Sequence, residues 1–355
     1  MDPVIKQIID AAIWAPSGDN SQPWRFQIIG DKLQIFNIPN RDNPILNFQQ
    51  SGSYIAHGAL IENLDLLTKA RGYDSTIILF PDKTNPDLIA EITLARNESD
   101  QASDNLEQYI NKRHTNRKPY QTGPLDNIAV EALKRVMGQE YGQLVVVTER
   151  EKINQLAPLL SQVERIALEN KDLHRSFFRS IFWDKVKNQR GEPGLFIKTL
   201  ELPPPARLLF KLLKFWSATC FANFFGFSRL ASKGNAKLYA QSGAYIAIIP
   251  KQDDPVGFVN AGRLMQRTWL TATSLGLSVQ PVTGILFMAR RFLSGDTGNF
   301  TQKHIDLALS AYRKITLTID VSNKNPIAML LRVGYGKVAT ARSARMGPTV
   351  QLGEF

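Results

Sequence analysis

Apolar residues recur along this chain with two different periods. Apolar positions three and four residues apart, as in Val4, Ile5, Ile8 and Ile9, are typical of a helix with one buried face. This spacing predicts helices over residues 3–15, 53–71, 106–111, 127–137, 151–170, 256–275 and 304–310. Apolar residues at every second position are typical of strands, and they predict strands over residues 24–29, 32–36, 75–80, 88–94, 143–147, 277–281, 314–319 and 329–335. The chain is therefore expected to mix helices and strands along its whole length.

Two of the predicted helices resemble each other. The segments Gly58–Gly72 and Gly262–Gly276 have glycines 14 residues apart, and Leu60 matches Leu264 in register. Each segment is followed by a predicted strand. Amphipathic helices that end in glycine match by chance fairly often, so this trace of a repeat gains weight only beside other motifs.

The composition is that of an ordinary globular protein. The chain has 355 residues, of which 43% are hydrophobic and 21% are charged, so one large domain or two domains are expected. The one cysteine, Cys220, excludes an intramolecular disulfide and metal sites built on several cysteines. The four histidines have no metal-ligand spacing, so no metal is expected. The first residues have the pattern of an amphipathic helix and not of an export signal, and a cytoplasmic location is expected.

The charge favours anionic partners. The 43 lysines and arginines exceed the 32 acidic residues and give a formal net charge of +11. Such a balance is typical of proteins that bind nucleic acid, a membrane surface or phosphorylated small molecules, although a basic surface without a dedicated ligand is equally compatible with it. The basic residues are spread along the chain, and no nucleic-acid-binding motif is present, so nucleic acid is not an expected partner.

Two polar motifs stand next to predicted elements in the first part of the chain. Residues 15–24, with the sequence APSGDNSQPW, form a rigid loop between a helix and a strand, or simply a helix stop and a turn. Residues 113–118, with the sequence RHTNRK, follow a short predicted helix. If that helix continues, Arg113 and Arg117 share one face, where two guanidinium groups can bind a phosphate; the alternative is a solvated basic helix end.

Two further motifs lie in the last part of the chain. Residues 281–284, with the sequence PVTG, end a strand at a glycine, where backbone N–H groups can face a ligand. Residues 334–345, with the sequence GYGKVATARSAR, contain two more arginines, Arg342 and Arg345. Each motif is unspecific by itself, and the chain has no dinucleotide-binding glycine motif.

The four motifs together resemble the FMN-dependent nitroreductase family. Residues 15–24 are similar to the family's Ala-Pro-Ser-Asn-Gln-Pro-Trp loop, and Arg113, Thr115 and Arg117 to its phosphate-binding arginine motif. The turn at 281–284 and the basic tail are similar to the family's flavin-ring and C-terminal motifs. Here the loop precedes the arginine motif, which resembles the order in the long, two-repeat branch of Acg-like proteins.

The resemblance implies an α+β fold in which a nitroreductase-like unit is duplicated within one chain as a pseudo-dimer, with mixed or antiparallel sheets flanked by helices. It implies a first repeat over residues 1–100 and a second over residues 101–355. The first repeat supplies the proline–serine–asparagine loop and the second the phosphate and ring contacts, so one FMN per chain is expected.

The resemblance also implies a set of site residues. The expected cofactor-binding residues are Pro16, Ser17, Gly18, Asn20, Arg113, His114, Thr115, Arg117, Pro281, Val282, Thr283, Gly284, Arg342 and Arg345. Among these, Arg113, Arg342 and Arg345 neutralise the phosphate, Arg117 lies at flavin N1 and O2, and the backbone of Thr283 and Gly284 lies at flavin N5. Thr283 stands where the family often has an acidic residue, and Met346 stands where related long-branch chains tend to have another arginine.

Residues 171–235 have no counterpart in short nitroreductases and are rich in apolar and aromatic residues. A hydrophobic helical lid over the flavin or over a neighbouring subunit is the favoured interpretation. An amphipathic helix on a membrane surface and ordinary core are the alternatives, and the uncharged run 215–228 is too short to span a bilayer. Cys220 is expected to be a buried apolar residue.

The implied function is that of an FMN-dependent oxidoreductase that takes hydride from NAD(P)H and reduces a nitroaromatic, a quinone or a similar small molecule. The alternative is a protein that stores or sequesters FMN beneath the lid, and oxygen-dependent flavin fragmentation is a third interpretation. Either a monomer or a homodimer is compatible with the sequence.

Overall fold

The computed structural model describes residues 3–96, 105–136, 140–321 and 325–353. Its helices are α1 (Pro3–Ala12), α2 (Ser51–Lys69), α3 (Asn127–Lys134), α4 (Arg150–Leu160), α5 (Gln162–Glu169), α6 (Lys171–Arg179), α7 (Lys185–Gln189), α8 (Pro204–Leu213), α9 (Trp216–Phe224), α10 (Phe227–Ala240), α11 (Pro255–Ser274), α12 (Gly284–Leu293) and α13 (Gln302–Thr318). Its strands are β1 (Trp24–Ile29), β2 (Lys32–Asn37), β3 (Tyr73–Leu79), β4 (Leu88–Arg96), β5 (Gly142–Val147), β6 (Ile181–Phe182), β7 (Leu195–Phe196), β8 (Ala244–Pro250), β9 (Ser278–Pro281), β10 (Met329–Gly334) and β11 (Val350–Leu352). The expected α+β class is confirmed.

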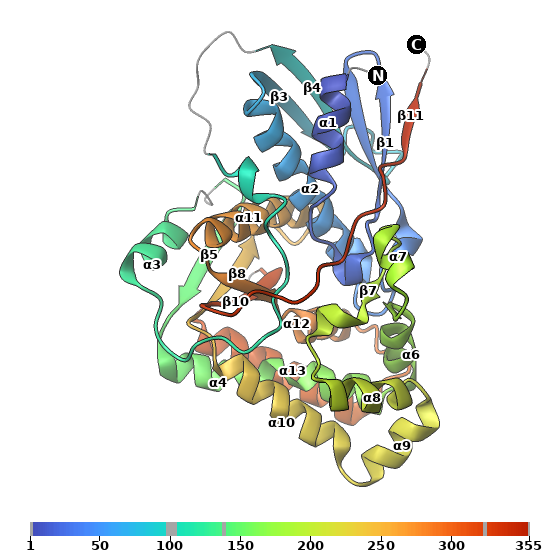
Figure 1. Cartoon of the computed structure of the whole chain (residues 1–355), viewed down its shortest axis with the longest axis vertical. Helices are drawn as coiled ribbons and strands as arrows, with labels where there is room; N and C mark the ends of the chain where they lie inside the picture. The colour runs from blue at the N-terminus through green and yellow to red at the C-terminus, as the bar shows by residue number, and fades with distance from the viewer. Residues whose placement is uncertain (1–2, 97–104, 137–139, 322–324, 354–355) are drawn as a thin grey trace.

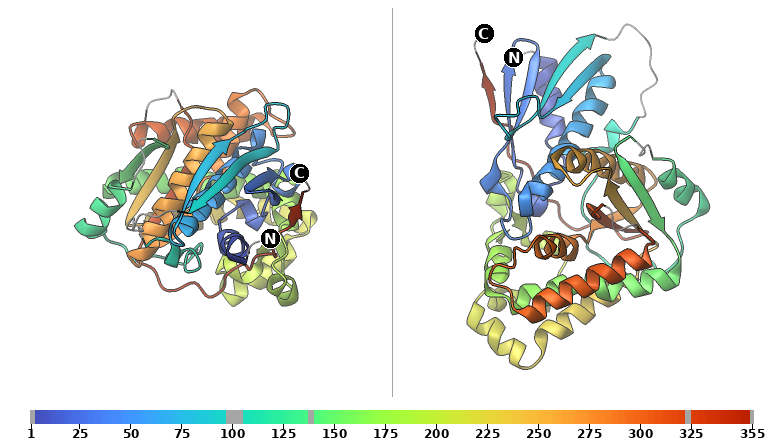
Figure 2. Two further views of the ribbon diagram at one scale, coloured as in Figure 1. Left: turned by 90° about the horizontal axis from the view of Figure 1, so that it is seen from above. Right: turned by 180° about the vertical axis from the view of Figure 1, so that it is seen from behind.

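The strands form two main sheets, one on each side of the central helices α2 and α11 (Figure 1). The first sheet has the order β11-β1-β2-β4-β3, and the second has the order β5-β8-β10-β9. Within these two sheets neighbouring strands are antiparallel except for β11, which pairs parallel to β1, and β6 and β7 form a separate two-stranded parallel sheet. The view from behind separates the two sheets clearly (Figure 2).

Helices α2 and α11 cross each other at two glycines. A Cβ atom on Gly58 would lie 1.9 Å from the Val259 carbonyl oxygen, and one on Gly262 would lie 2.1 Å from the Ile55 carbonyl oxygen. Only glycine allows backbones to approach this closely. These glycines are the ones that the sequence repeat aligns, so equivalent positions of the two segments meet. This supports the predicted duplication.

A buried polar network lies beside the crossing. The Arg263 side chain of α11 donates to Glu62 at 3.0 Å and to Asp65 at 3.1 Å, and both carboxylates belong to α2. Arg267 also donates to Glu62, at 2.7 Å. Because buried charges are costly unless they are paired, these contacts fix the angular position of one helix on the other.

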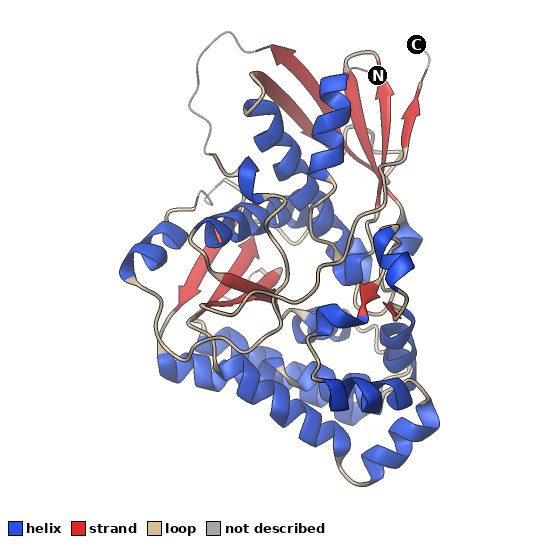
Figure 3. Cartoon of the chain, in the orientation of Figure 1, coloured by secondary structure: helices blue, strands red, loops and turns tan. Residues whose placement is uncertain are grey.

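The C-terminal segment joins the two halves. After β10 it runs as an extended loop along the molecule and ends in β11, where Phe26 lies opposite Val350 (Figure 3). The division into repeats at residues 100 and 101 lies outside the described residues, and the two-repeat division stays a prediction.

Several predicted elements differ from the structure. The predicted helix 151–170 is divided at Ser161 into α4 and α5. The predicted strand 314–319 is wrong, because residues 314–318 belong to α13. The Thr301 side chain accepts a hydrogen bond from the His304 N–H group at the start of this helix, which continues to Thr318. The strand β8, buried along its whole length, and the helix α12 were not predicted. Fully buried strands lack the alternation that marks half-buried ones.

The crossing predicts a specific sensitivity to small substitutions. Gly58→Ala or Gly262→Ala should lower the free energy of unfolding by about 3 kcal/mol or more, because the added methyl group meets backbone that cannot move independently. Gly234→Ala is the matched control, since Gly234 lies in α10 with nothing within 4 Å of the added Cβ. It should be neutral or stabilising by up to about 1 kcal/mol. Urea unfolding measures each variant, and equal stabilities of all three would contradict the close crossing.

Candidate functional site

The loop after α1 has an unusual backbone. Asp19, Asn20 and Gln22 have φ values of 46°, 60° and 51°, in the left-handed region that non-glycine residues seldom adopt. The Ser17 hydroxyl accepts a hydrogen bond from the Gln22 N–H group at 3.0 Å, which closes the loop on itself. Strained backbone of this kind persists where the surrounding structure holds it, and it is concentrated at binding sites.

The surrounding structure here is the C-terminal tail and the insertion. The Gln22 side-chain amide donates to the Gly191 carbonyl at 2.9 Å and accepts from the Met346 N–H group at 2.9 Å. The Asn20 side-chain amide donates to the Ala344 carbonyl at 3.3 Å. Gly191 has a φ of 69° and no space for a Cβ atom, which would lie 2.0 Å from the Arg345 carbonyl group. Two segments far apart in sequence therefore hold this loop.

Three arginines gather beside the loop around Trp14. The Arg113 guanidinium donates to the Trp14 carbonyl at 2.9 Å, and Arg345 donates to the Ala15 carbonyl at 2.9 Å. Arg342 donates to the Asn111 carbonyl, and its guanidinium lies 4.0 Å from the centre of the Trp14 ring. Carbonyl oxygens orient these cations but do not neutralise them.

The cluster has an excess of buried positive charge. No ion pair between any of the three arginines and an acidic side chain occurs within the described ranges. Burial lowers the pKa of Arg342 to about 10, and burial together with the Arg342 charge lowers the pKa of Arg345 to about 9. Burial and the charges of both neighbours hold the pKa of Arg113 well below its usual value. Each cation raises the cost of charging the others, so the cluster favours a bound anion.

Unpartnered atoms point to the same conclusion. Arg113 Nε, Arg342 Nη2 and Asn20 Oδ1 are buried and have no hydrogen-bond partner among the described residues. Buried polar groups are nearly always paired, so such groups call for a ligand or an ordered water. Two of the three atoms are cationic donors, which suits a phosphate.

The segment with Arg113 and Arg117 is not a helix. Only a short 3₁₀ turn, Glu107–Tyr109, precedes it, so the prediction that the two arginines share one helix face is wrong. Thr115 forms a β-bridge with Val279, and Pro119 disfavours helical backbone just before it. Extended backbone spreads the two arginines along the cavity instead of stacking them.

Arg117 lies apart from the three-arginine cluster. Its guanidinium donates to the Thr199 carbonyl at 3.0 Å, and burial lowers its pKa while the Asp19 carboxylate raises it. The backbone of this segment is held by the fully buried Arg332, which donates to the Lys118 carbonyl at 2.8 Å.

The turn at residues 281–284 leads into α12, which begins at Gly284. The first N–H groups of any helix have no partner inside that helix, and the N-terminal end carries partial positive charge. The Thr283 hydroxyl is directed to Met329 Sδ and the Leu330 carbonyl, so the backbone of this residue is fixed next to β10.

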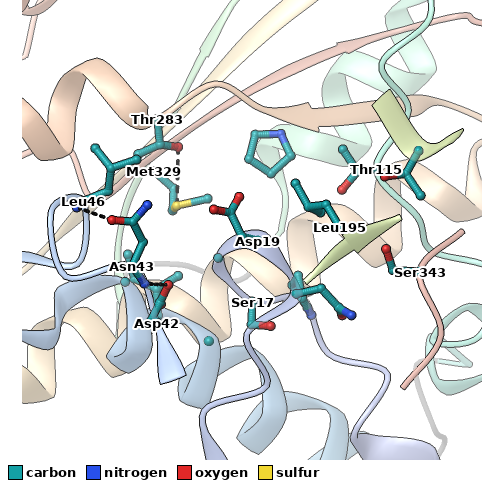
Figure 4. Close-up of a pocket in the computed structure, with 18 of the residues that line it drawn as sticks. Ser17, Asp19, Asp42, Asn43, Leu46, Thr115, Leu195, Thr283, Met329 and Ser343 are labelled. Carbon is teal, nitrogen blue, oxygen red and sulfur yellow. Dashed lines mark hydrogen bonds between the residues drawn. The ribbon is translucent and has the colours of Figure 1, made fainter. Parts of the chain in front are cut away.

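These parts line one cavity of about 290 Å³. Figure 4 shows Ser17 and Asp19 from the first half of the chain among Thr283, Met329 and Leu195 from the second. Of the residues predicted from the sequence, the cavity brings together Pro16, Ser17, Gly18, Asn20, Arg113, His114, Thr115, Arg117, Pro281, Thr283, Gly284, Arg342 and Arg345. Val282 does not line it, because its side chain packs in the core of the second half.

The sequence analysis did not predict several lining residues. They are Asp19, Asp42, Asn43, Leu46, Asn47, Gly52, Ile55, Ala56, Leu195, Thr199, Met265, Trp269, Phe287, Met329, Ala341 and Ser343. Asp19 stands inside the predicted loop motif and was detectable there. Ile55 and Ala56 of α2 and Met265 and Trp269 of α11 lie on helix faces whose spacing looks like ordinary core.

Two of these residues place carboxyl groups in the cavity wall. Burial raises the pKa of Asp42 to about 7, and the Asp19 charge adds to this rise. Burial also raises the pKa of Asp19, against the opposing effect of Arg117 and of hydrogen bonds from Ser180 and Asn43. The cavity therefore has a cationic cluster at one part of its wall and two acids elsewhere.

Comparisons with known proteins found relatives of low sequence identity. No family model matches the chain. A Mycobacterium tuberculosis protein named as uncharacterized is 26% identical over 81% of this chain, and the match spans 40% of that protein's length. A second M. tuberculosis protein, named putative NAD(P)H nitroreductase, is 22% identical over 81% of this chain and 78% of its own. The chain is therefore similar in sequence to a protein that carries a nitroreductase name.

Solved nitroreductases align with the chain at low similarity. A Bacteroides fragilis nitroreductase with bound FMN is 10% identical, with a TM-score of 0.36 over 69% of this chain and 96% of that one. An FMN-dependent nitroreductase from Mycobacterium smegmatis in complex with NADPH is 13% identical, with a TM-score of 0.36 over 65% and 87%.

The raised pKa of Asp42 predicts a pH dependence of stability for this chain when no ligand occupies the cavity. Between about pH 4 and pH 7 the folded state holds a proton that the unfolded state releases, so the free energy of unfolding falls as pH rises through this range. In the Asp42→Asn variant, the free energy of unfolding should decrease less steeply over this pH range. Urea unfolding between pH 4 and pH 8 measures it, and a variant profile parallel to that of the unmodified protein would show that Asp42 is not the titrating group.

Proposed function

We propose that the chain binds FMN in the described cavity and is an FMN-dependent oxidoreductase of the nitroreductase type. The observation that carries the proposal is the unneutralised cluster of Arg113, Arg342 and Arg345 beside the proline–serine–asparagine loop. A dianionic phosphate ester is the ligand that such a cluster suits best, since guanidinium groups bind phosphate oxygens in pairs.

The donor set fits FMN at both ends of the cavity. Buried Arg113 Nε and Arg342 Nη2 lack partners and are available to phosphate oxygens. At the other part of the wall, Thr283 and Gly284 open α12, and apolar Leu46, Met329 and Phe287 offer contacts to a flat ring. Catalytic cofactor sites commonly combine an apolar wall with a few placed polar groups.

The chain's own residues would bind and orient rather than react. When bound, FMN supplies the hydride and electron transfer. The three arginines would hold the phosphate, and the start of α12 would present N–H groups and positive potential to the ring. The Arg117 cation would stabilise negative charge on the reduced flavin ring. NADH or NADPH is the proposed electron donor, and a quinone, a nitroaromatic or a similar small molecule is the proposed acceptor.

The phosphate assignment predicts a selective loss of affinity. The double variant Arg113→Met/Arg345→Met should bind FMN at least about tenfold more weakly, because charge-assisted hydrogen bonds are lost. Its affinity for riboflavin, which lacks the phosphate, should change little. Flavin fluorescence titration of the flavin-free protein measures both affinities, with Arg313→Met, an exposed arginine of α13, as the matched control. Equal losses for FMN and riboflavin would contradict the assignment.

The oxidoreductase proposal predicts that NADH or NADPH bleaches the flavin absorption band under anaerobic conditions. A quinone or a nitroaromatic acceptor should then reoxidise the flavin and restore the band on the time scale of enzyme turnover. Stopped-flow absorption measures both steps. Reduction by dithionite alone, with none by either nicotinamide nucleotide, would instead indicate storage of the flavin.

A further inference from the structure

Helices α8 and α9 form a hairpin at one end of the molecule, with α10 leading back to the second sheet (Figures 1 and 2). Its outward surface carries large apolar side chains, which we call the apolar tip. The tip consists of Leu208, Leu209, Leu212, Phe215, Phe221, Phe224, Phe225 and Leu230.

The apolar tip is exposed while the hairpin beneath it is well packed. Phe221 is 70% exposed and Phe224 is 84% exposed. On the inward face, Leu213 and Thr219 are buried, and the Thr219 hydroxyl and the Leu213 carbonyl both lie within hydrogen-bond distance of the buried His174. The exposed rings are therefore held outward by a fixed scaffold. The Phe225 ring contacts the rings of Phe221 and Phe224, and clustered exposed apolar side chains of this kind mark an interaction site.

The charged residues of α8, α9 and α10 themselves are all basic. Residues 202–252 contain no aspartate or glutamate. The exposed cations are Lys211, Lys214, Arg229, Lys233 and Lys237. None of the five forms an ion pair with a described residue, so their charge is available to a partner. The partner should therefore have both an apolar region that large side chains can enter and a negatively charged surface.

We propose that the apolar tip docks on the surface of a lipid bilayer that contains anionic lipids. Aromatic and leucine side chains enter the boundary between headgroups and acyl chains, while lysines and arginines meet the headgroups. A second copy of the chain is a poorer occupant, because a symmetric contact between two tips brings like charges together. Within the described residues, no helix has the length and the apolar character that crossing a membrane requires, so the contact is peripheral.

Vesicle co-sedimentation tests the proposal with the full chain. The protein should sediment with phosphatidylcholine vesicles that contain phosphatidylserine, and much less with phosphatidylcholine alone. Phe221→Ser/Phe224→Ser/Phe225→Ser should reduce the bound fraction at least about tenfold. The matched control is Ile128→Ser/Leu317→Ser, in which two residues that are each 79% exposed in α3 and α13 lose apolar surface away from the tip.

The electrostatic part has its own variant. Lys211→Gln/Lys214→Gln should weaken binding to the anionic vesicles about tenfold and reduce its salt dependence. The exposed Cys220 of α9, contrary to its predicted burial, allows an environment-sensitive fluorophore to be attached next to Phe221. Its emission should shift to the blue on addition of the anionic vesicles.

Three results would overturn the proposal. They are an absence of sedimentation with either vesicle, equal binding by the phenylalanine variant and its control, and a concentration-dependent dimer that the phenylalanine variant abolishes. The last result would assign the tip to a second copy. Flavin binding is independent of all three, because no residue of α8 or α9 lines the cavity.

Discussion

The close crossing of α2 and α11 is the constraint on which the site depends. Gly58 and Gly262 let the two backbones touch, and the residues next to them, Ile55 on α2 and Met265 on α11, line the cavity. A wider spacing of α2 and α11 would widen the cavity where these two helices line it. It would also move the loop after α1 away from the arginines. The same contact therefore joins the two halves of the fold and sets the dimensions of the site.

Electrostatics divides the cavity into two parts with different tasks. Arg113, Arg342 and Arg345 are oriented by carbonyl groups alone, so their charge remains available to an anion. Asp19 faces Arg117 instead, and its charge does not cancel the cluster. If the carboxylates lay beside the three arginines, they would form internal ion pairs and the cluster would no longer favour a bound anion.

The sequence was most informative where a local motif itself forms the wall of the site. Residues 16–20 of the loop and the arginines stand at fixed spacing in the sequence, and the structure brings them to one cavity, while their binding of a flavin stays a prediction. Leu195 and Thr199 were not predicted, because they reach the site only through the packing of the insertion. The helix assumed for Arg113–Arg117 failed for a similar reason, since pairing with Val279 and a following proline outweigh local charge spacing. Long-range contacts of this kind leave no periodic signal.

The insertion is better understood as two structures than as one lid. Leu195 lines the cavity from β7, whereas α8 and α9 present their apolar surface away from it. A lid over the cavity would bury its aromatic residues against that cavity, and ordinary core would bury them among neighbours. Phe224, at 84% exposure, does neither. Leaving so much apolar surface in water is unfavourable, and the charged residues of α8, α9 and α10 are all basic. A surface that is both apolar and anionic, as proposed above, would suit these helices.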